Sequence, residues 1–181
     1  MCSKNKIKLL ILDVDGVLTN GKVYYGNSEE MMGFHVQDGS GLHQLRQKGI
    51  IVAVISGRES TAVKRRLAEL QIQHVFLAQS DKLAAYQTLL STLQFTDEQV
   101  AYVGDDVADI PVMEKVALPI AVANAVPAAK KIAKWCTIKE GGNGAVREVC
   151  DYLLYPSHFE MRFFYRISKC LIAMGFQRGE S

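Results

Sequence analysis

Hydrophobic residues along the chain fall into short uninterrupted runs that alternate with longer segments of mixed polarity. The runs have no helical period, which is typical of strands buried on both faces of a sheet. They lie at residues 9–12, 50–55, 74–77, 100–103 and 118–122. Helices are predicted at residues 42–48, around Val63, Leu67 and Leu70, and at 83–93, 110–116, 127–135 and 145–154. This alternation predicts an α/β protein, a Rossmann-like three-layer sandwich with a central parallel sheet and helices on both faces.

One segment departs from the alternation of strands and helices. Asn20-Gly21 and Gly26-Asn27 flank a short β-prone run, which predicts a small β-hairpin insertion at about residues 20–34. Residues 34–37 then alternate in polarity like a strand. The glycine-rich residues 38–41 are expected to form a turn before the helix at 42–48.

Composition limits the classes of protein to consider. The 181 residues are 49% hydrophobic and 22% charged, as in one ordinary folded domain. The net charge of +2 is too small to indicate binding to nucleic acid. The apolar run near the N-terminus meets Asp13 too soon for a signal peptide, so a cytoplasmic location is expected. The 4 cysteines show no C-x-x-C spacing and are expected to be reduced thiols.

Carboxylates follow two of the predicted strands directly. Asp13 and Asp15 end the first strand, and Asp105, Asp106 and Asp109 follow the run at 100–103. A buried carboxylate is costly unless it is paired or bound to a metal. The carboxyl ends of parallel strands meet at one edge, and oxygen ligands suit Mg²⁺. Asp13, Asp15 and Asp105 are therefore the predicted metal ligands, although Asp13-Val14-Asp15-Gly16 alone also fits a plain Asx-type turn.

A phosphate site is predicted at the same edge. Ser56 and Arg58 lie at a turn between a strand and a helix, where a phosphate can meet the helix N-terminus. The alternative for this turn is a simple helix cap by Ser60 or Thr61. Lys82 falls in the first turn of a predicted helix, where the helix dipole disfavours a cation, and this indicates a functional lysine.

A metal, a carboxylate nucleophile and phosphate-holding cations together indicate phosphoryl transfer to aspartate. In this hypothesis Asp13 attacks the phosphorus atom. Asp15 protonates the leaving alkoxide and then deprotonates the attacking water.

The motifs Asp13-Val14-Asp15-Gly16-Val17, Ser56, Lys82 and Gly104-Asp105-Asp106-x-x-Asp109 are similar, in order, to those of the haloacid-dehalogenase superfamily. A narrower resemblance is to the 3-deoxy-D-manno-octulosonate 8-phosphate phosphatases. It is carried by residues 15–19, 34–41, 56–58, 79–82, 102–106 and 142–149. This resemblance implies a capless, Mg²⁺-dependent phosphatase of lipopolysaccharide precursor biosynthesis, which forms a homotetramer through its hairpins. It also implies a phosphatase domain at residues 1–154 that bears the hairpin.

The resemblance also implies roles for single residues. Asp13, Asp15, Ser56 and Lys82 match catalytic positions, and Asp15 would bind the metal through its backbone carbonyl. Asp106 and Asp109 match positions that orient Lys82 and metal-bound water. The positions that match substrate contacts are Asp15, His35, Val36, Gln37, Asp38, Gly39, His43, Gly57, Arg58, Arg66 and Lys82.

The chain departs from the family in two places. The family loop often has Asn and Arg where this chain has His35 and Gln37, and an arginine is common at the position of His43. Residues 155–181 do not resemble the usual short polar tail, because aromatic and basic side chains are mixed there. A helix packed on another subunit is expected for this tail, and contact with a membrane surface is the alternative.

Two other functions fit parts of the same pattern. One is a phosphatase that acts on a nine-carbon sialic-type acid phosphate. The other is a non-catalytic, oligomerising domain like those attached to some sugar-nucleotide synthetases. That class often lacks the second aspartate or the lysine, whereas Asp15 and Lys82 are both present here.

Overall fold

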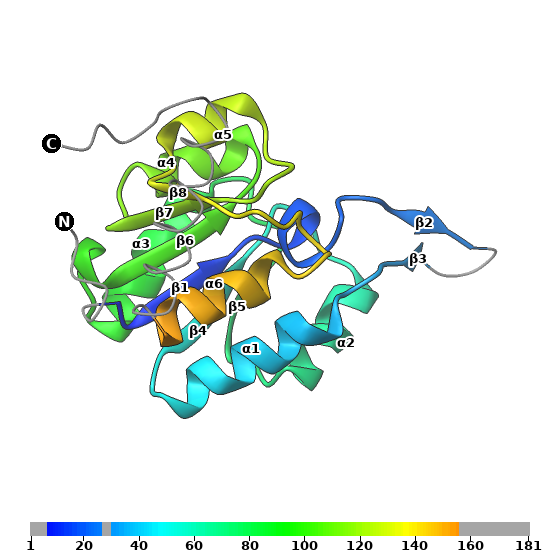
Figure 1. Ribbon diagram of the computed structural model, residues 1–181, viewed down its shortest axis with the longest axis horizontal. Coiled ribbons are helices and arrows are strands. Elements are labelled where there is room, and N and C mark those ends of the chain that lie inside the picture. The colour runs from blue at the N-terminus through cyan, green and yellow to red at the C-terminus, as the bar shows by residue number, and fades with distance from the viewer. Residues whose placement is uncertain (1–6, 27–29, 156–181) are drawn as a thin grey trace, which may run out of the picture.

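A six-stranded parallel sheet lies at the centre of the computed structural model, which describes residues 7–26 and 30–155 (Figure 1). The strand order is β5-β4-β1-β6-β7-β8. The strands are β1 (Leu9–Leu12), β4 (Ile51–Ile55), β5 (His74–Phe76), β6 (Val100–Gly104), β7 (Leu118–Ala121) and β8 (Trp135–Cys136). Central β1 pairs with β4 and β6, and Leu12 lies opposite Val54 and Val103. The predicted parallel sheet is confirmed, and Asp13 leaves it beside the ends of both neighbouring strands.

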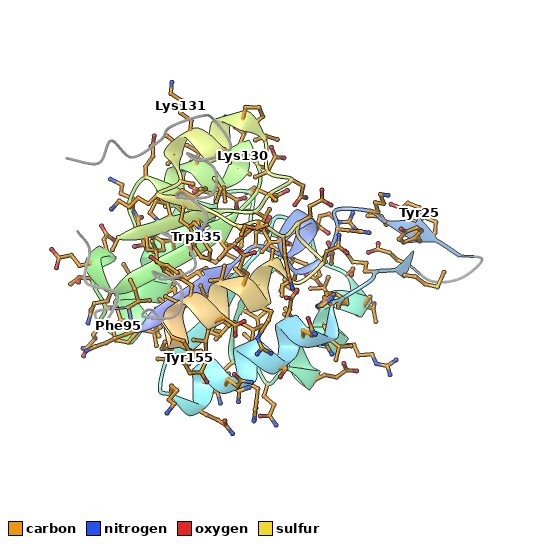
Figure 2. All side chains as sticks on the ribbon, in the orientation of Figure 1. Tyr25, Phe95, Lys130, Lys131, Trp135 and Tyr155 are labelled. Atoms are coloured by element: carbon orange, nitrogen blue, oxygen red, sulfur yellow. The ribbon has the colours of Figure 1, made fainter. Side chains whose placement is uncertain are left out.

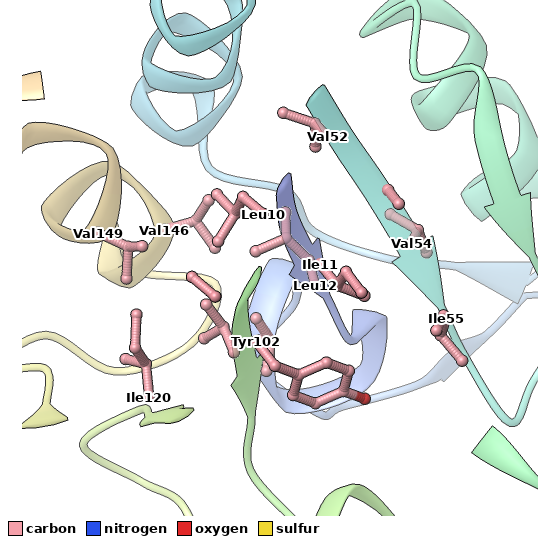
Figure 3. Packing of buried hydrophobic residues seen from close by; sticks show 14 of the residues in the cluster. Leu10, Ile11, Leu12, Val52, Val54, Ile55, Tyr102, Ile120, Val146 and Val149 are labelled. Carbon is pink, nitrogen blue, oxygen red and sulfur yellow. The ribbon is translucent and has the colours of Figure 1, made fainter. Parts of the chain in front are cut away.

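Helices cover both faces of the sheet. They are α1 (Val36–Gln47), α2 (Thr61–Glu69), α3 (Lys82–Leu93), α4 (Ile110–Met113), α5 (Pro127–Ile132) and α6 (Ala145–Leu154). α1 and α6 pack against each other, and α4 packs between α3 and α5 (Figure 1). Every residue of β1 is fully buried, and Figure 3 shows its side chains beside those of β4 and α6. The continuous apolar run is therefore explained by burial on both faces.

The segment after the hairpin differs from the prediction. Residues 36–41 belong to α1, so the expected strand at 34–37 and the expected turn at 38–41 are both wrong. Gly39 and Gly41 allow neighbouring helices to pack closely against α1. A methyl group at Gly39 would lie 2.8 Å from Arg66 Nη2, and one at Gly41 would lie 2.9 Å from the Cβ of Cys150 in α6.

Two helices in the C-terminal half are shorter than the sequence predicts. α4 ends at Met113 and α5 at Ile132, so the helices predicted at 110–116 and 127–135 are shorter. Trp135, the last residue of the second predicted helix, instead begins strand β8, which pairs with β7. α6 spans the predicted residues. The predicted C-terminal helix lies outside the described residues.

The predicted hairpin is confirmed. β2 (Tyr24–Tyr25) and β3 (Glu30–Met31) pair antiparallel and project from the body of the molecule (Figure 1). Tyr25, which is labelled in Figure 2, is 81% exposed. Met31 is 59% exposed. No helix within the described ranges is long and apolar enough to cross a membrane.

Candidate active site

A tight turn after β1 brings the first two aspartates toward the end of β6. Gly16 has a φ of 87°, which a residue with a side chain rarely adopts. Any Cβ at Gly16 would also collide with the carboxylate of Asp105. The Thr19 hydroxyl closes the turn, because it donates to the Val14 carbonyl and accepts from the Gly16 N–H, each at 3.3 Å. The turn thus places the backbone beside Asp15 directly against Asp105.

Three carboxylates gather at this edge of the sheet. One oxygen from each of Asp13, Asp105 and Asp109 lies within 4.8 Å of the others. Asp109 is fully buried and already hydrogen-bonded at both oxygens. Its Oδ1 accepts from Lys82 Nζ and the Tyr102 hydroxyl, each at 2.7 Å, and its Oδ2 accepts from the N–H groups of Asp105 and Asp106. Asp109 is therefore a fixed support, and Asp13 and Asp105 keep oxygens for a ligand.

Lys82 lies in the middle of this cluster. It is 6% exposed, and its Nζ is 2.9 Å from Asp13 Oδ1 as well as 2.7 Å from Asp109 Oδ1. Burial works against its charge, but the two carboxylates outweigh burial and raise the pKa of Lys82. Asp81 caps α3 by accepting from the N–H groups of Leu83 and Ala84. The lysine is therefore directed into the site and held there as a cation.

The site contains more carboxylates than positively charged side chains. Burial, reinforced by the charge of Asp109, raises the pKa of Asp13 to about 8 and that of Asp105 to about 7. The Oδ1 atoms of Asp15 and Asp105 are buried and have no hydrogen-bond partner among the described residues. A hard cation would relieve both conditions, and the oxygens of Asp13 and Asp105 with the backbone carbonyl of Asp15 are ligands that suit Mg²⁺. The residues present therefore fit the predicted metal.

The turn after β4 carries the next predicted group. Ser56 is 2% exposed and lies at the end of β4, where its Oγ accepts from the Arg58 N–H at 3.3 Å. The Arg58 Nε lies 3.5 Å from Asp15 Oδ2. Ser60 caps α2 by accepting from the Val63 N–H, so the helix-cap interpretation is correct for Ser60. Because Ser60 already caps α2, Ser56 and Arg58 are not needed for capping and can serve another function.

A second polar cluster surrounds the start of α1. Asp38 is 2% exposed, and its Oδ1 accepts from the Arg147 N–H, which caps α6 from a neighbouring helix. Burial raises the pKa of Asp38, and its Oδ2 has no partner in the described part of the chain. The guanidinium of Arg66 lies 6.0 Å from the centre of the Phe34 ring. Buried atoms without a partner, His35 Nδ1 and Arg66 Nε among them, thus accompany the predicted sugar-acid residues.

Most of the other predicted substrate residues are exposed. His43 is exposed and bonds to Gln47 one turn further along α1. Val36 and Gln37 are exposed at the start of that helix, and Gly57 is exposed in the turn after Ser56. Gly39, by contrast, is buried against α2. In the described part of the chain, His43 forms a hydrogen bond with Gln47 and none with the carboxylate cluster or with the residues around Asp38.

The structure adds contacts to which the motifs assigned no role. Tyr102 of β6 fixes Asp109 through its hydroxyl, and only its position two residues before Gly104 hinted at such a role. Glu30 of the hairpin binds Arg58 Nη2 at 2.9 Å. Lys139 places its ammonium over Gly144, next to His35, and its charge acts on Asp38. No local spacing in the sequence links Glu30 or Lys139 to the site.

Comparison with known proteins identifies the family. Residues 74–149 match the family model described as haloacid dehalogenase-like hydrolase. The 3-deoxy-D-manno-octulosonate 8-phosphate phosphatase KdsC of Escherichia coli strain K12 is 52% identical over 149 residues, which cover 82% of this chain and 79% of the relative. The chain belongs to the 3-deoxy-D-manno-octulosonate 8-phosphate phosphatase family.

Solved structures of this phosphatase family share the fold. The enzyme from Yersinia pestis is 49% identical with a TM-score of 0.82, and the match covers 83% of this chain and 82% of that chain. The enzyme from Moraxella catarrhalis, solved in complex with a magnesium ion, a phosphate ion and a KDO molecule, is 39% identical. Its TM-score is 0.83, and the match covers 91% of this chain and 95% of that chain. The predicted resemblance to the phosphatase family is confirmed.

Proposed function

We propose that this protein is a Mg²⁺-dependent phosphatase that hydrolyses 3-deoxy-D-manno-octulosonate 8-phosphate to the free sugar acid and phosphate. The observation that carries the proposal is the cluster of Asp13 and Asp105, with the buried Lys82 paired to Asp13, at the edge where parallel strands end. Family membership and the magnesium, phosphate and KDO molecule named for the Moraxella enzyme support the same function. Asp13, Asp105 and the Asp15 carbonyl would hold the metal.

Asp13 is the proposed nucleophile. Lys82 holds its Oδ1, so the other carboxylate oxygen remains to form the bond to phosphorus while the bond from phosphorus to the sugar oxygen breaks. Asp15 gives its proton to the leaving alkoxide. It then takes a proton from the water that attacks the aspartyl-phosphate and releases phosphate. Mg²⁺, when bound, would supply positive charge that offsets the repulsion between the Asp13 carboxylate and the phosphate.

Substrate binding is divided between the two polar clusters. We assign the phosphate to Ser56 and Lys82 and the sugar acid to Arg58, Arg66 and the segment 35–39, with Gly57 beside them. Asp109 accepts a hydrogen bond from Lys82, and Asp106 and Asp109 would together orient the lysine and metal-bound water. His43 faces outward on α1, so in our proposal it reaches the substrate of a neighbouring subunit.

Arg66 provides a test of the sugar-acid assignment. We expect Arg66→Ala to lower kcat/KM for the eight-carbon substrate by about ten- to a hundredfold, because a charge-assisted hydrogen bond to its carboxylate is lost. Hydrolysis of a small aryl phosphate, which has no carboxylate, should stay within about twofold of the wild type. Arg65→Ala, in the exposed neighbouring residue, is the matched control. Equal losses on both substrates would place Arg66 in structure or phosphate binding.

We also propose a cytoplasmic homotetramer. Residues 1–154 would form its phosphatase domain, and 155–181 a separate tail. The exposed Tyr24, Tyr25 and Met31 support assembly through the hairpin, because a lone two-stranded hairpin is marginal in water. We expect a tetramer in sedimentation at micromolar concentration and smaller species for Tyr25→Asp. A wild-type monomer would contradict this assembly.

Phosphate release from a panel of sugar phosphates, measured with and without Mg²⁺, tests the proposed function. We expect turnover of the eight-carbon acid phosphate only with Mg²⁺. No turnover of any phosphate ester would favour the non-catalytic domain. The intact Asp15 and Lys82 argue against that alternative.

A further inference from the structure

We infer that Glu30 is a positioning residue that holds Arg58 away from Asp15 and so keeps the proposed proton donor free. The inference rests on the proposed function only in taking Asp15 as the acid that protonates the leaving group. It concerns a hairpin residue that belongs to none of the catalytic motifs.

Arg58 lies between two carboxylates that bind it unequally. Its Nη2 donates to Glu30 Oε1 at 2.9 Å, a full hydrogen bond. Its Nε is 3.5 Å from Asp15 Oδ2, which is an ion pair without a normal hydrogen bond. Glu30 is therefore the stronger partner of the guanidinium.

Among the described residues, none donates a hydrogen bond to the Asp15 carboxylate. Its Oδ1 is buried and has no partner among the described residues, and its Oδ2 makes only the long contact with Arg58. A guanidinium beside a carboxylate ordinarily forms a short, bidentate pair with it. The pull of Glu30 on the far side of the guanidinium explains why that pair does not form here.

The backbone of Arg58 is anchored while its side chain can turn toward either Glu30 or Asp15. Its backbone is fixed, because its N–H donates to Ser56 Oγ and its carbonyl accepts from the Ala78 N–H. The side chain is 42% exposed, so its direction depends on its charged partners. Glu30 is better shielded, at 24%, and comes from β3 on the projecting hairpin. Without Glu30, the guanidinium is free to close onto Asp15.

Closure of Arg58 onto Asp15 has a specific kinetic signature. A carboxyl group whose two oxygens are both taken up by a guanidinium has no oxygen left to direct a proton at the leaving group, so substrates with a poor leaving group should suffer most. p-Nitrophenolate leaves without a proton, whereas phenolate and sugar alkoxides benefit from one. A merely structural defect would slow all of these substrates alike.

The test uses Glu30→Met in the full-length protein loaded with Mg²⁺. We expect kcat/KM to fall about tenfold for phenyl phosphate and to stay within about twofold for p-nitrophenyl phosphate. Glu59→Met, which alters the exposed neighbour of Arg58, is the matched control and should change neither. The double variant Glu30→Met/Arg58→Met should equal Arg58→Met alone on phenyl phosphate, because Glu30 acts only through Arg58.

Equal losses on both aryl phosphates, no loss on either, or an undiminished effect of Glu30→Met in the Arg58→Met background would overturn the inference. These measurements use aryl phosphates, so they test the role of Glu30 independently of which sugar phosphate is the natural substrate. A wild type that hydrolyses aryl phosphates but not the eight-carbon acid phosphate would refute the proposed substrate and leave the Glu30 result to be judged by itself. A wild type inactive on every ester would overturn both.

Discussion

Replacement of Asp13 by asparagine is expected to abolish turnover, with kcat lower by at least about 10⁴-fold. An amide cannot form the bond to phosphorus that the carboxylate forms, while its size and one acceptor oxygen are kept. The fold should remain, because Lys82 keeps Asp109 as its partner at 2.7 Å. Burial already disfavours the charge of Asp13, so its neutralisation should not lower the thermal stability of the metal-free protein.

Steady-state kinetics and thermal unfolding check this expectation together. Asp151→Asn is a suitable control, because Asp151 forms a partly exposed ion pair with Arg147 on α6, away from the carboxylate cluster. Asp13→Asn with a near-native rate would refute the covalent mechanism. Loss of the native fold in Asp13→Asn would instead show that the carboxylate is structural.

Removal of the metal is the second change with a large expected effect. We expect exhaustive chelation to reduce activity to below about 1% and Mg²⁺ to restore it, whereas Ca²⁺ should not. Ca²⁺ takes more ligands at longer distances, which would displace the nucleophile from the phosphate. Full activity after chelation would contradict the proposed site.

The carboxyl pKa values add a readout that needs no turnover. Without a metal, burial raises the pKa of Asp13 to about 8 and that of Asp105 to about 7, above the ordinary value of 3.8. Proton binding by these groups stabilises the metal-free fold fully below about pH 4, and this stabilisation is lost as the pH rises through about 7 to 8. Mg²⁺ should therefore raise the Tm by more at about pH 8.5 than at about pH 6. An equal shift at both pH values would argue against binding at these carboxylates.

Much of the site could be predicted because its chemistry lies at strand ends. Asp13 and Asp105 follow fully buried apolar runs, so the sequence pattern alone places them at one edge of the sheet. Lys82 was recognisable because a cation is unfavourable in the first turn of a helix. The topology then brings Lys82 into contact with Asp13, and Asp13 within ligand distance of Asp105.

The remaining features depend on contacts between distant segments. Gly39 and Gly41 suggest a turn locally, but the packing of α1 against α2 and α6 determines that they lie in a helix. Glu30 meets Arg58 across 28 positions of sequence. Asp38 caps a helix 109 positions away. Such partners leave no periodic or spacing signal in one sequence.

The comparison of kcat/KM for the eight-carbon acid 8-phosphate and a nine-carbon sialic-type acid 9-phosphate, with Mg²⁺ present, tests the central claim most directly. We predict that the eight-carbon substrate is preferred by at least about a hundredfold, since in the proposed binding mode the phosphate and the carboxylate are held by two separate polar clusters of fixed position. A preference for the nine-carbon substrate, or no turnover of the eight-carbon one, would contradict the proposed function.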